Sequence, residues 1–129
     1  MNFVCPFFYF LNMNRIYYIK NPTIETKENR YEISWFLNDS DFDVPELFSF
    51  TISIDELREI SEKIRMPFTS FIMYTVIERS VEWLLNELLG TKDDKCKYRM
   101  DVHSQFVEDN KNILKQMEEM INGQISRTA

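Results

Sequence analysis

The sequence predicts an α+β fold, in which an antiparallel sheet of three to five strands from the N-terminal half packs against three helices from the C-terminal half. Two observations predict it. Before residue 53, apolar and polar residues alternate, as they do in a strand with one buried face. After residue 53, apolar residues recur every three or four positions, as in an amphipathic helix. Strands followed by helices are typical of a two-layer domain, and a chain of 129 residues fits one such domain, over residues 1–129.

Four segments of the first half have strand character: residues 15–20, 23–27, 30–37 and 47–53. Asn21 and Pro22 separate the first two segments, because these residue types favour turns. Glu28 and Asn29 separate the next two and predict a two-residue hairpin turn, in which asparagine tolerates a positive φ. The last two segments each have one apolar face and one mostly polar face, which indicates an antiparallel sheet with one side open to water.

A capping box marks the change from strands to helices. The hydroxyl of Ser53 is placed to accept from the backbone N–H of Glu56, and the Glu56 carboxylate is placed to reach back to the Ser53 N–H. A first helix should therefore begin after Ser53. It should end before Pro67, because the residue preceding a proline disfavours helical geometry.

Two longer helices should follow. Residues 68–89 are apolar over more than half of the helix circumference, which predicts a central helix with Gly90 as its C-cap. Residues 91–100 are mostly charged and are expected to form a connection. Residues 101–123 have a narrower apolar stripe and are expected to form the third helix.

The N-terminal residues are apolar and belong to none of these elements. No basic residue precedes the apolar run 3–11 and no small-residue cleavage site follows it, so a secretory signal is not expected. A run of nine residues is also too short to span a bilayer. We expect residues 1–12 to form an apolar extension or an edge strand, since Pro6 suits only an edge or a bulge.

The composition excludes several classes of function. A net charge of −6 and a pI near 4.8 disfavour binding to nucleic acid, whose phosphates attract basic proteins. With only two glycines, the chain has no glycine-rich loop to hold a phosphate. The two cysteines, Cys5 and Cys96, form no disulfide framework and no zinc motif, so we expect free thiols, a cytoplasmic location and no cofactor.

The residue types that perform catalysis are isolated in this sequence. His103 is the single histidine, lies beside Asp101, and is accompanied by no Ser, Cys or Lys motif. Cys96 lies between two lysines, which favour a thiolate, but no base is positioned next to it. We therefore do not expect an enzyme.

A short acidic segment resembles the opening of a calcium-binding loop. Asp39, Asp41 and Asp43 occupy every second position, as the first ligands of an EF-hand do. An EF-hand also needs glycine at its sixth position and glutamate at its twelfth, where this chain has Val44 and Phe50. We therefore expect no metal site.

The acidity of the chain is concentrated in residues 38–66. This stretch contains eight acids and three bases, a net charge of −5 out of the total −6. An acidic surface with an aromatic anchor suits a basic partner, although the same pattern also fits a solvated turn followed by an ordinary helix face. The predicted partner-binding residues are Asp39, Asp41, Phe42, Asp43, Glu46, Glu56 and Glu59.

These patterns favour a non-enzymatic binding protein that inhibits a basic protein partner, such as a nuclease toxin. In size, acidity and lack of catalytic residues the chain is similar to bacterial immunity and inhibitor proteins as a class, although no motif carries the similarity. Two alternatives stay open. One is a homodimeric assembly module that uses residues 71–89 and the C-terminal helix, and the other is a small enzyme with a site around His103 or Cys96. No membrane partner is expected, and the abundance of Asn, Lys, Ile, Phe and Tyr is typical of a bacterial or phage source.

Overall fold

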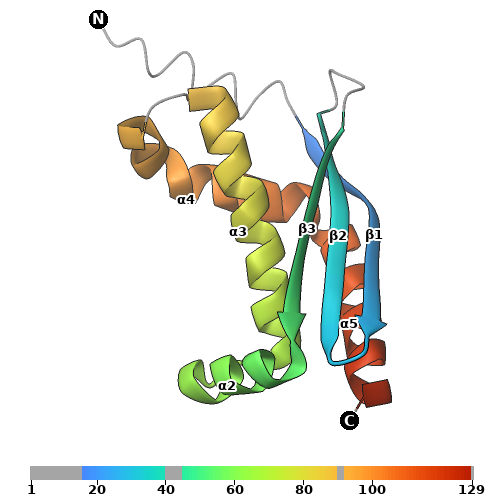
Figure 1. Cartoon of the computed structure of the whole chain (residues 1–129). Helices are drawn as coiled ribbons and strands as arrows, with labels where there is room; N and C mark the ends of the chain where they lie inside the picture. The colour runs from blue at the N-terminus through green and yellow to red at the C-terminus, as the bar shows by residue number, and fades with distance from the viewer. Residues whose placement is uncertain (1–15, 40–44, 90–91, 129) are drawn as a thin grey trace, which may run out of the picture.

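The first half of the chain forms a three-stranded antiparallel sheet with the order β1-β2-β3 (Figure 1). The structure, a computed structural model, describes residues 16–39, 45–89 and 92–128. The strands are β1 (Tyr17–Lys27), β2 (Arg30–Asp39) and β3 (Glu46–Ser53), and helices follow them, so the predicted α+β fold is confirmed.

Strand β1 contains most of the segment 15–20 and all of the segment 23–27, which were predicted to form separate strands. The register with β2 shifts between Lys20 and Thr23, which marks a bulge, and Asn21 within it has a φ of 50°. Asparagine adopts this left-handed geometry more easily than most residues, and Pro22 suits a bulge because it has no N–H to pair. The Asn-Pro pair therefore bends one strand instead of ending it.

The predicted hairpin joins β1 to β2 and is confirmed. Lys27 pairs with Arg30 across the sheet, which leaves Glu28 and Asn29 as the two turn residues. The left-handed conformation is adopted by Glu28, with a φ of 49°, and not by Asn29.

One face of the sheet carries the core. The side chains of Tyr31, Ile33, Trp35 and Leu37 on β2 are buried, as their alternation predicts. The ring of Trp35 lies at the centre, where it stacks on Phe48 with a centroid distance of 5.5 Å. Its indole Nε1–H donates a hydrogen bond of 3.0 Å to the Ser80 hydroxyl, which ties the sheet to the helical layer.

Helix α2 (Ile54–Ile64) begins at the predicted cap. Ser53 is its N-cap, and the Ser53 hydroxyl accepts from the Glu56 N–H at 3.0 Å. The helix ends at Arg65, whose left-handed backbone, with φ 52° and ψ 45°, directs its N–H to the Ser61 carbonyl. The predicted end before Pro67 is confirmed.

The left-handed backbone at Arg65 leads to a test of stability. Because only glycine adopts this geometry without a steric penalty, Arg65→Gly should raise the free energy of unfolding by about 0.5–1 kcal/mol. Glu62→Gly, three residues earlier and inside the helix, should lower it by about 1 kcal/mol. Urea denaturation measures both, and two changes of the same sign would contradict the assignment of the helix end.

Helix α3 (Phe68–Leu89) has the predicted bounds, but the segment after it differs from the prediction. Residues 91–123, expected as a connection and one helix, instead form most of two helices, α4 (Lys92–Asp109) and α5 (Lys111–Thr128), which run in different directions (Figure 1). Helix α4 begins before the predicted start at residue 101, and its stripe of buried side chains also begins before that residue, at Tyr98. Tyr98, Val102 and Phe106 are buried at successive four-residue intervals, and lysine, arginine and methionine favour helices.

Asn110 stands where α4 meets α5 and joins both helices to β1. Its side-chain Oδ1 accepts from the Ile19 N–H at 2.9 Å, and its Nδ2 donates to the Tyr17 carbonyl at 2.7 Å. Nδ2 also donates to the carbonyl of Phe106 at 2.9 Å. The buried amide therefore pairs with the edge of β1 as a neighbouring strand would.

The helices lie on one side of the sheet. Figure 1 shows α3 beside β3 and α5 behind β1 and β2, and buried side chains from all three strands and from α2, α3, α4 and α5 form one core. Among the described residues, no helix or strand covers the opposite face of the sheet, which we call the open face. In the part of the chain that the structure describes, no helix is both long and apolar enough to cross a membrane.

Candidate functional site

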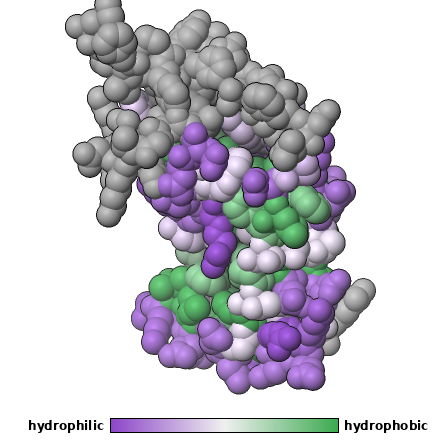
Figure 2. Space-filling view, turned by 45° about the horizontal axis from the view of Figure 1, so that its top comes forward, coloured by the Kyte–Doolittle hydropathy of each residue, from purple (hydrophilic) through white to green (hydrophobic). Residues whose placement is uncertain are grey.

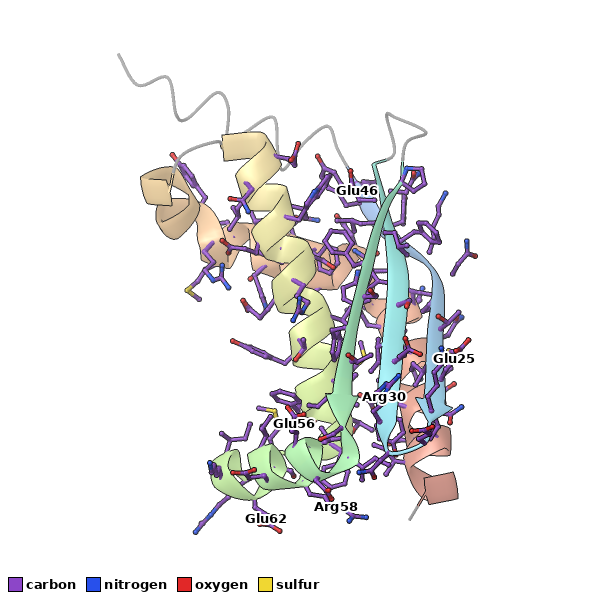
Figure 3. All side chains as sticks on the ribbon, viewed as in Figure 1. Glu25, Arg30, Glu46, Glu56, Arg58 and Glu62 are labelled. Atoms are coloured by element: carbon purple, nitrogen blue, oxygen red, sulfur yellow. The ribbon has the colours of Figure 1, made fainter. Side chains whose placement is uncertain are left out.

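The predicted acidic surface is divided between the two ends of β3. Glu46 starts the strand, whereas Glu56 and Glu59 follow its end on α2. A strand of eight residues is about 25 Å long, and Figure 3 shows Glu46 at the opposite end of β3 from Glu56. The exposed carboxylates of Glu46, Glu56 and Glu59 therefore do not form one patch. Residues 41–43 and the side chain of Asp39 lie outside the described part.

Most of the negative charge belongs to the end where β3 begins. Residues 54–65 contain four acids and three bases, a net charge of only −1, and Lys63 pairs with Glu59 at 3.0 Å. The other four acids of the stretch are those of the β2–β3 connection: Asp39, Asp41, Asp43 and Glu46. The acidic centre is thus this connection and not α2.

Exposed apolar side chains gather at the same end, on the open face of the sheet. We call Tyr18, Phe36, Pro45 and Leu47 the end patch. Leu47 is 61% exposed and Tyr18 is 40% exposed, while Phe36 is half-buried and pairs with Leu47 across the strands. Figure 2 shows apolar side chains, in green, reaching the surface near the sheet and again near α2.

The end patch borders a shallow depression of about 360 Å³. Its lining residues are Lys20, Asn21, Phe36, Asn38 and Pro45. The sequence contained one signal for the patch, because Phe36 is the apolar residue on the otherwise polar face of β2. The alternation of residues 47–53 puts Leu47 on the polar face, but the extent of its exposure was not predicted, since leucines are mostly buried.

The other end of the open face is charged. Lys27 Nζ lies 2.5 Å from Glu32 Oε2 and 3.8 Å from Glu25 Oε2. The hydrogen bond from Lys27 and its positive charge lower the pKa of Glu32, and the same contact raises the pKa of Lys27. The open face therefore changes along the strands from apolar to ion-paired.

This ion pair has a measurable pH dependence. Because the pKa of Glu32 is lower in the folded chain, its contribution to stability is present above the unfolded pKa and is lost as the pH falls through the folded pKa. The Glu32 resonance in an NMR titration should give a pKa below the usual range of a glutamate, and Lys27→Met should return it to that range. An equal Glu32 pKa in both proteins would contradict the pairing.

His103 lies in a cluster of charged side chains between α3 and α4. Its Nε2 is 3.7 Å from Glu78 Oε1, so its acidic neighbour is Glu78 and not Asp101. Arg99 binds Glu78 through Nη2 and Glu82 through Nη1, the latter at 2.7 Å. One guanidinium therefore compensates two carboxylates that would otherwise repel each other at i,i+4 spacing, and the cluster is a bridge between two helices.

Metal binding and thiol chemistry gain no support from the geometry. Among the residues that the structure describes, no three His, Cys, Asp or Glu side chains gather closely enough to hold a metal ion. The side chain of Cys96 lies outside the described part, as does Cys5.

The apolar arc of α3, which the alternative homodimer hypothesis uses as an interface, is largely buried within the chain. Ile72, Val76, Val81 and Leu85 are fully buried against the sheet and the other helices. On α5, Met117 and Ile121 are buried in the same core. The breadth of the arc reflects a central helix with neighbours on several sides.

Comparisons with known proteins identify no relative of this chain. The chain matches no protein-family model, no curated protein and no solved structure.

Proposed function

We propose that this chain is a non-enzymatic protein that binds and inhibits a basic protein partner through the β2–β3 end of its sheet. The observation that carries the proposal is the end patch beside the acidic connection. Leu47, 61% exposed, lies directly after Glu46, and four of the chain's acids lie between residues 39 and 46.

This arrangement has the composition of a protein interface. Binding energy is concentrated in a few large apolar or aromatic side chains that become fully buried, and charged residues around them exclude water and set the choice of partner. Tyr18, Phe36 and Leu47 supply the apolar centre here. The four acids that the sequence concentrates between residues 39 and 46 accelerate the encounter with a positively charged surface.

A nuclease toxin is the class of partner that this surface fits best. Nucleases bind a phosphate backbone and therefore present clusters of lysine and arginine. A patch of carboxylates blocks such a cluster by occupying the place of the phosphates. We place this interaction in the cytoplasm, because the chain has two cysteines and no disulfide framework.

Affinity capture with the purified chain tests the proposal. A basic protein from an extract of the source organism should be retained by the wild type. Leu47→Ser, which removes the apolar centre, and Glu46→Lys, which reverses a flanking charge, should each weaken its binding about tenfold or more. Glu118→Lys, a charge reversal at an exposed position of α5, is the control and should bind like the wild type.

Two results would contradict the proposal. In the first, the captured protein is acidic or binds equally well to all the variants. In the second, Glu118→Lys weakens binding as much as Glu46→Lys, which would show a response to net charge and not to this surface.

A further inference from the structure

The two edges of the sheet differ in their protection. An unpaired edge strand offers free backbone N–H and C=O groups, and proteins usually block it with a bulge, proline, lysine or another element. Strand β1 has all four, namely the bulge, Pro22, Lys20 and the side chain of Asn110. Strand β3 has none of them within Leu47–Ser53 (LFSFTIS), where there is no charge, no proline and no register shift with β2.

The hydrogen bond of Ile19 on β1 shows which backbone N–H and C=O groups of β3 point away from the sheet. Successive residues of a strand direct their N–H and C=O to opposite sides, and Ile19 directs its N–H outward to Asn110. Its cross-strand neighbour Leu37 therefore directs its groups toward β3, where they pair with Glu46. By the same alternation, the backbone groups of Leu47, Ser49 and Thr51 point away from β2. Within the described residues nothing pairs with them.

Beside this edge lies an aromatic rim on the core side. Phe48, Phe50 and Trp83 are only half-buried, although they contact the core. The rings of Phe48 and Trp83 meet edge to face at 6.1 Å, and the exposed guanidinium of Arg79 lies 5.4 Å from the centroid of Phe50. The rim is thus a row of large rings whose outer sides face solvent.

Charged side chains lie only beyond the two ends of the segment Leu47–Ser53 on β3. Glu46 lies at its start, whereas Arg30, which pairs with Ser53, and Arg58 on α2 lie at its end (Figure 3). Within the part of the chain that the structure describes, none of these three side chains forms an ion pair.

We infer that β3 is a self-association edge, along which a second copy of this chain adds its own β3 in antiparallel pairing. Only outward-directed residues can hydrogen-bond across the new junction, and a two-fold axis at Ser49 satisfies this condition. Leu47 then faces Thr51 of the partner subunit, and Phe48 packs against Phe50 of the partner subunit. The product is one six-stranded sheet with a continuous aromatic rim.

A second copy fits this edge better than a basic strand. The seven residues of the pairing segment carry no charge, so two copies meet without repulsion despite their net charge of −6 each. A basic strand would find no carboxylate along this segment. The inference goes beyond the proposed inhibition, because it requires no other protein.

Sedimentation equilibrium of the purified full chain tests this inference. The apparent mass of the wild type should rise with concentration from the chain mass of 15.6 kDa toward twice that mass. Ser49→Pro removes an outward N–H without touching the ladder to β2 and should raise the dimer Kd about tenfold or more. Ser49→Ala keeps the N–H and should dimerise like the wild type.

A second set of variants does not depend on tolerance of proline. Thr51→Lys places a charge on the exposed face of the edge and should also weaken the dimer about tenfold. Adding Leu47→Glu to Thr51→Lys should restore the dimer. Position 47 of one subunit faces position 51 of the other across the axis, so the two new charges attract each other. The inference is wrong if the wild type is monomeric up to millimolar concentration, or if both Ser49→Pro and Thr51→Lys remain as dimeric as the wild type.

Dimerisation and inhibition fail in different ways. Sedimentation is measured without any partner, so a monomeric wild type that still captures a basic protein would overturn only the dimer. A dimer that captures no basic protein would overturn only the proposed function.

Discussion

Asn110→Ala is expected to lower the free energy of unfolding by about 2–4 kcal/mol. The change removes the acceptor of the Ile19 N–H and the donor to the Tyr17 carbonyl, and both groups are buried at the edge of β1. A buried backbone group left without a partner costs about 1–3 kcal/mol. Urea denaturation followed by far-ultraviolet circular dichroism measures the loss.

The matched control is Asn112→Ala, two residues further along α5 at an exposed position. It should change the stability by no more than about 0.5 kcal/mol. Asn110→Asp separates the shape of the side chain from its hydrogen bonds. It keeps the acceptor for the Ile19 N–H but loses the two N–H donors to the carbonyls of Tyr17 and Phe106. It should therefore also lower the free energy of unfolding. Equal stability of Asn110→Ala and Asn112→Ala would show that the joint between the helices and β1 does not form as described.

Ser80→Ala is expected to destabilise the chain by about 1–3 kcal/mol, because it leaves the buried indole N–H of Trp35 without an acceptor. Trp35→Phe should cost a similar or larger amount, since it also leaves space in a fully buried site. The double variant should lose about 1 kcal/mol less than the sum of the two single changes, because each single change breaks the same bond.

The control for this cycle is Ser70→Ala, which lies on the same helix at an exposed position. It should be close to neutral. Chemical denaturation of the four proteins of the cycle gives the coupling energy. Strict additivity of the two single changes would contradict a hydrogen bond between the sheet and α3.

The local elements were predictable, because each depends on residues close together in the sequence. The hairpin at 28–29, the cap at Ser53 and both ends of α3 all follow from short-range signals. The start of α4 was missed although Tyr98 continues the spacing of Val102 and Phe106, since the charges around it suggested a connection.

The hydrogen bonds between Asn110 and β1 could not have been predicted in the same way. The sequence shows only that a polar residue interrupts an apolar stripe. Its meaning depends on Tyr17 and Ile19, more than 90 residues away, whose edge groups it satisfies. A side chain that replaces a strand is recognised only when the strand is in place.

The candidate site was predicted in part. The sequence located the acidic stretch, but it could not show that β3 separates Glu46 from Glu56 and Glu59. The alternation of residues 47–53 puts Leu47 on the polar face, but it could not show that Leu47 pairs with Phe36 there and is 61% exposed. The fold therefore moves the proposed surface from the whole acidic stretch to one end of the sheet, and α2 becomes a nearly neutral helix outside it.

We propose that the β2–β3 end of the sheet binds a basic protein. Amide hydrogen exchange of the chain, alone and in complex with the captured partner, tests it most directly. Slower exchange is expected in the complex around Tyr18, Phe36 and Leu47, with the exchange of α5 unchanged. Slower exchange confined to α4 and α5, with the end patch exchanging as in the free chain, would contradict it.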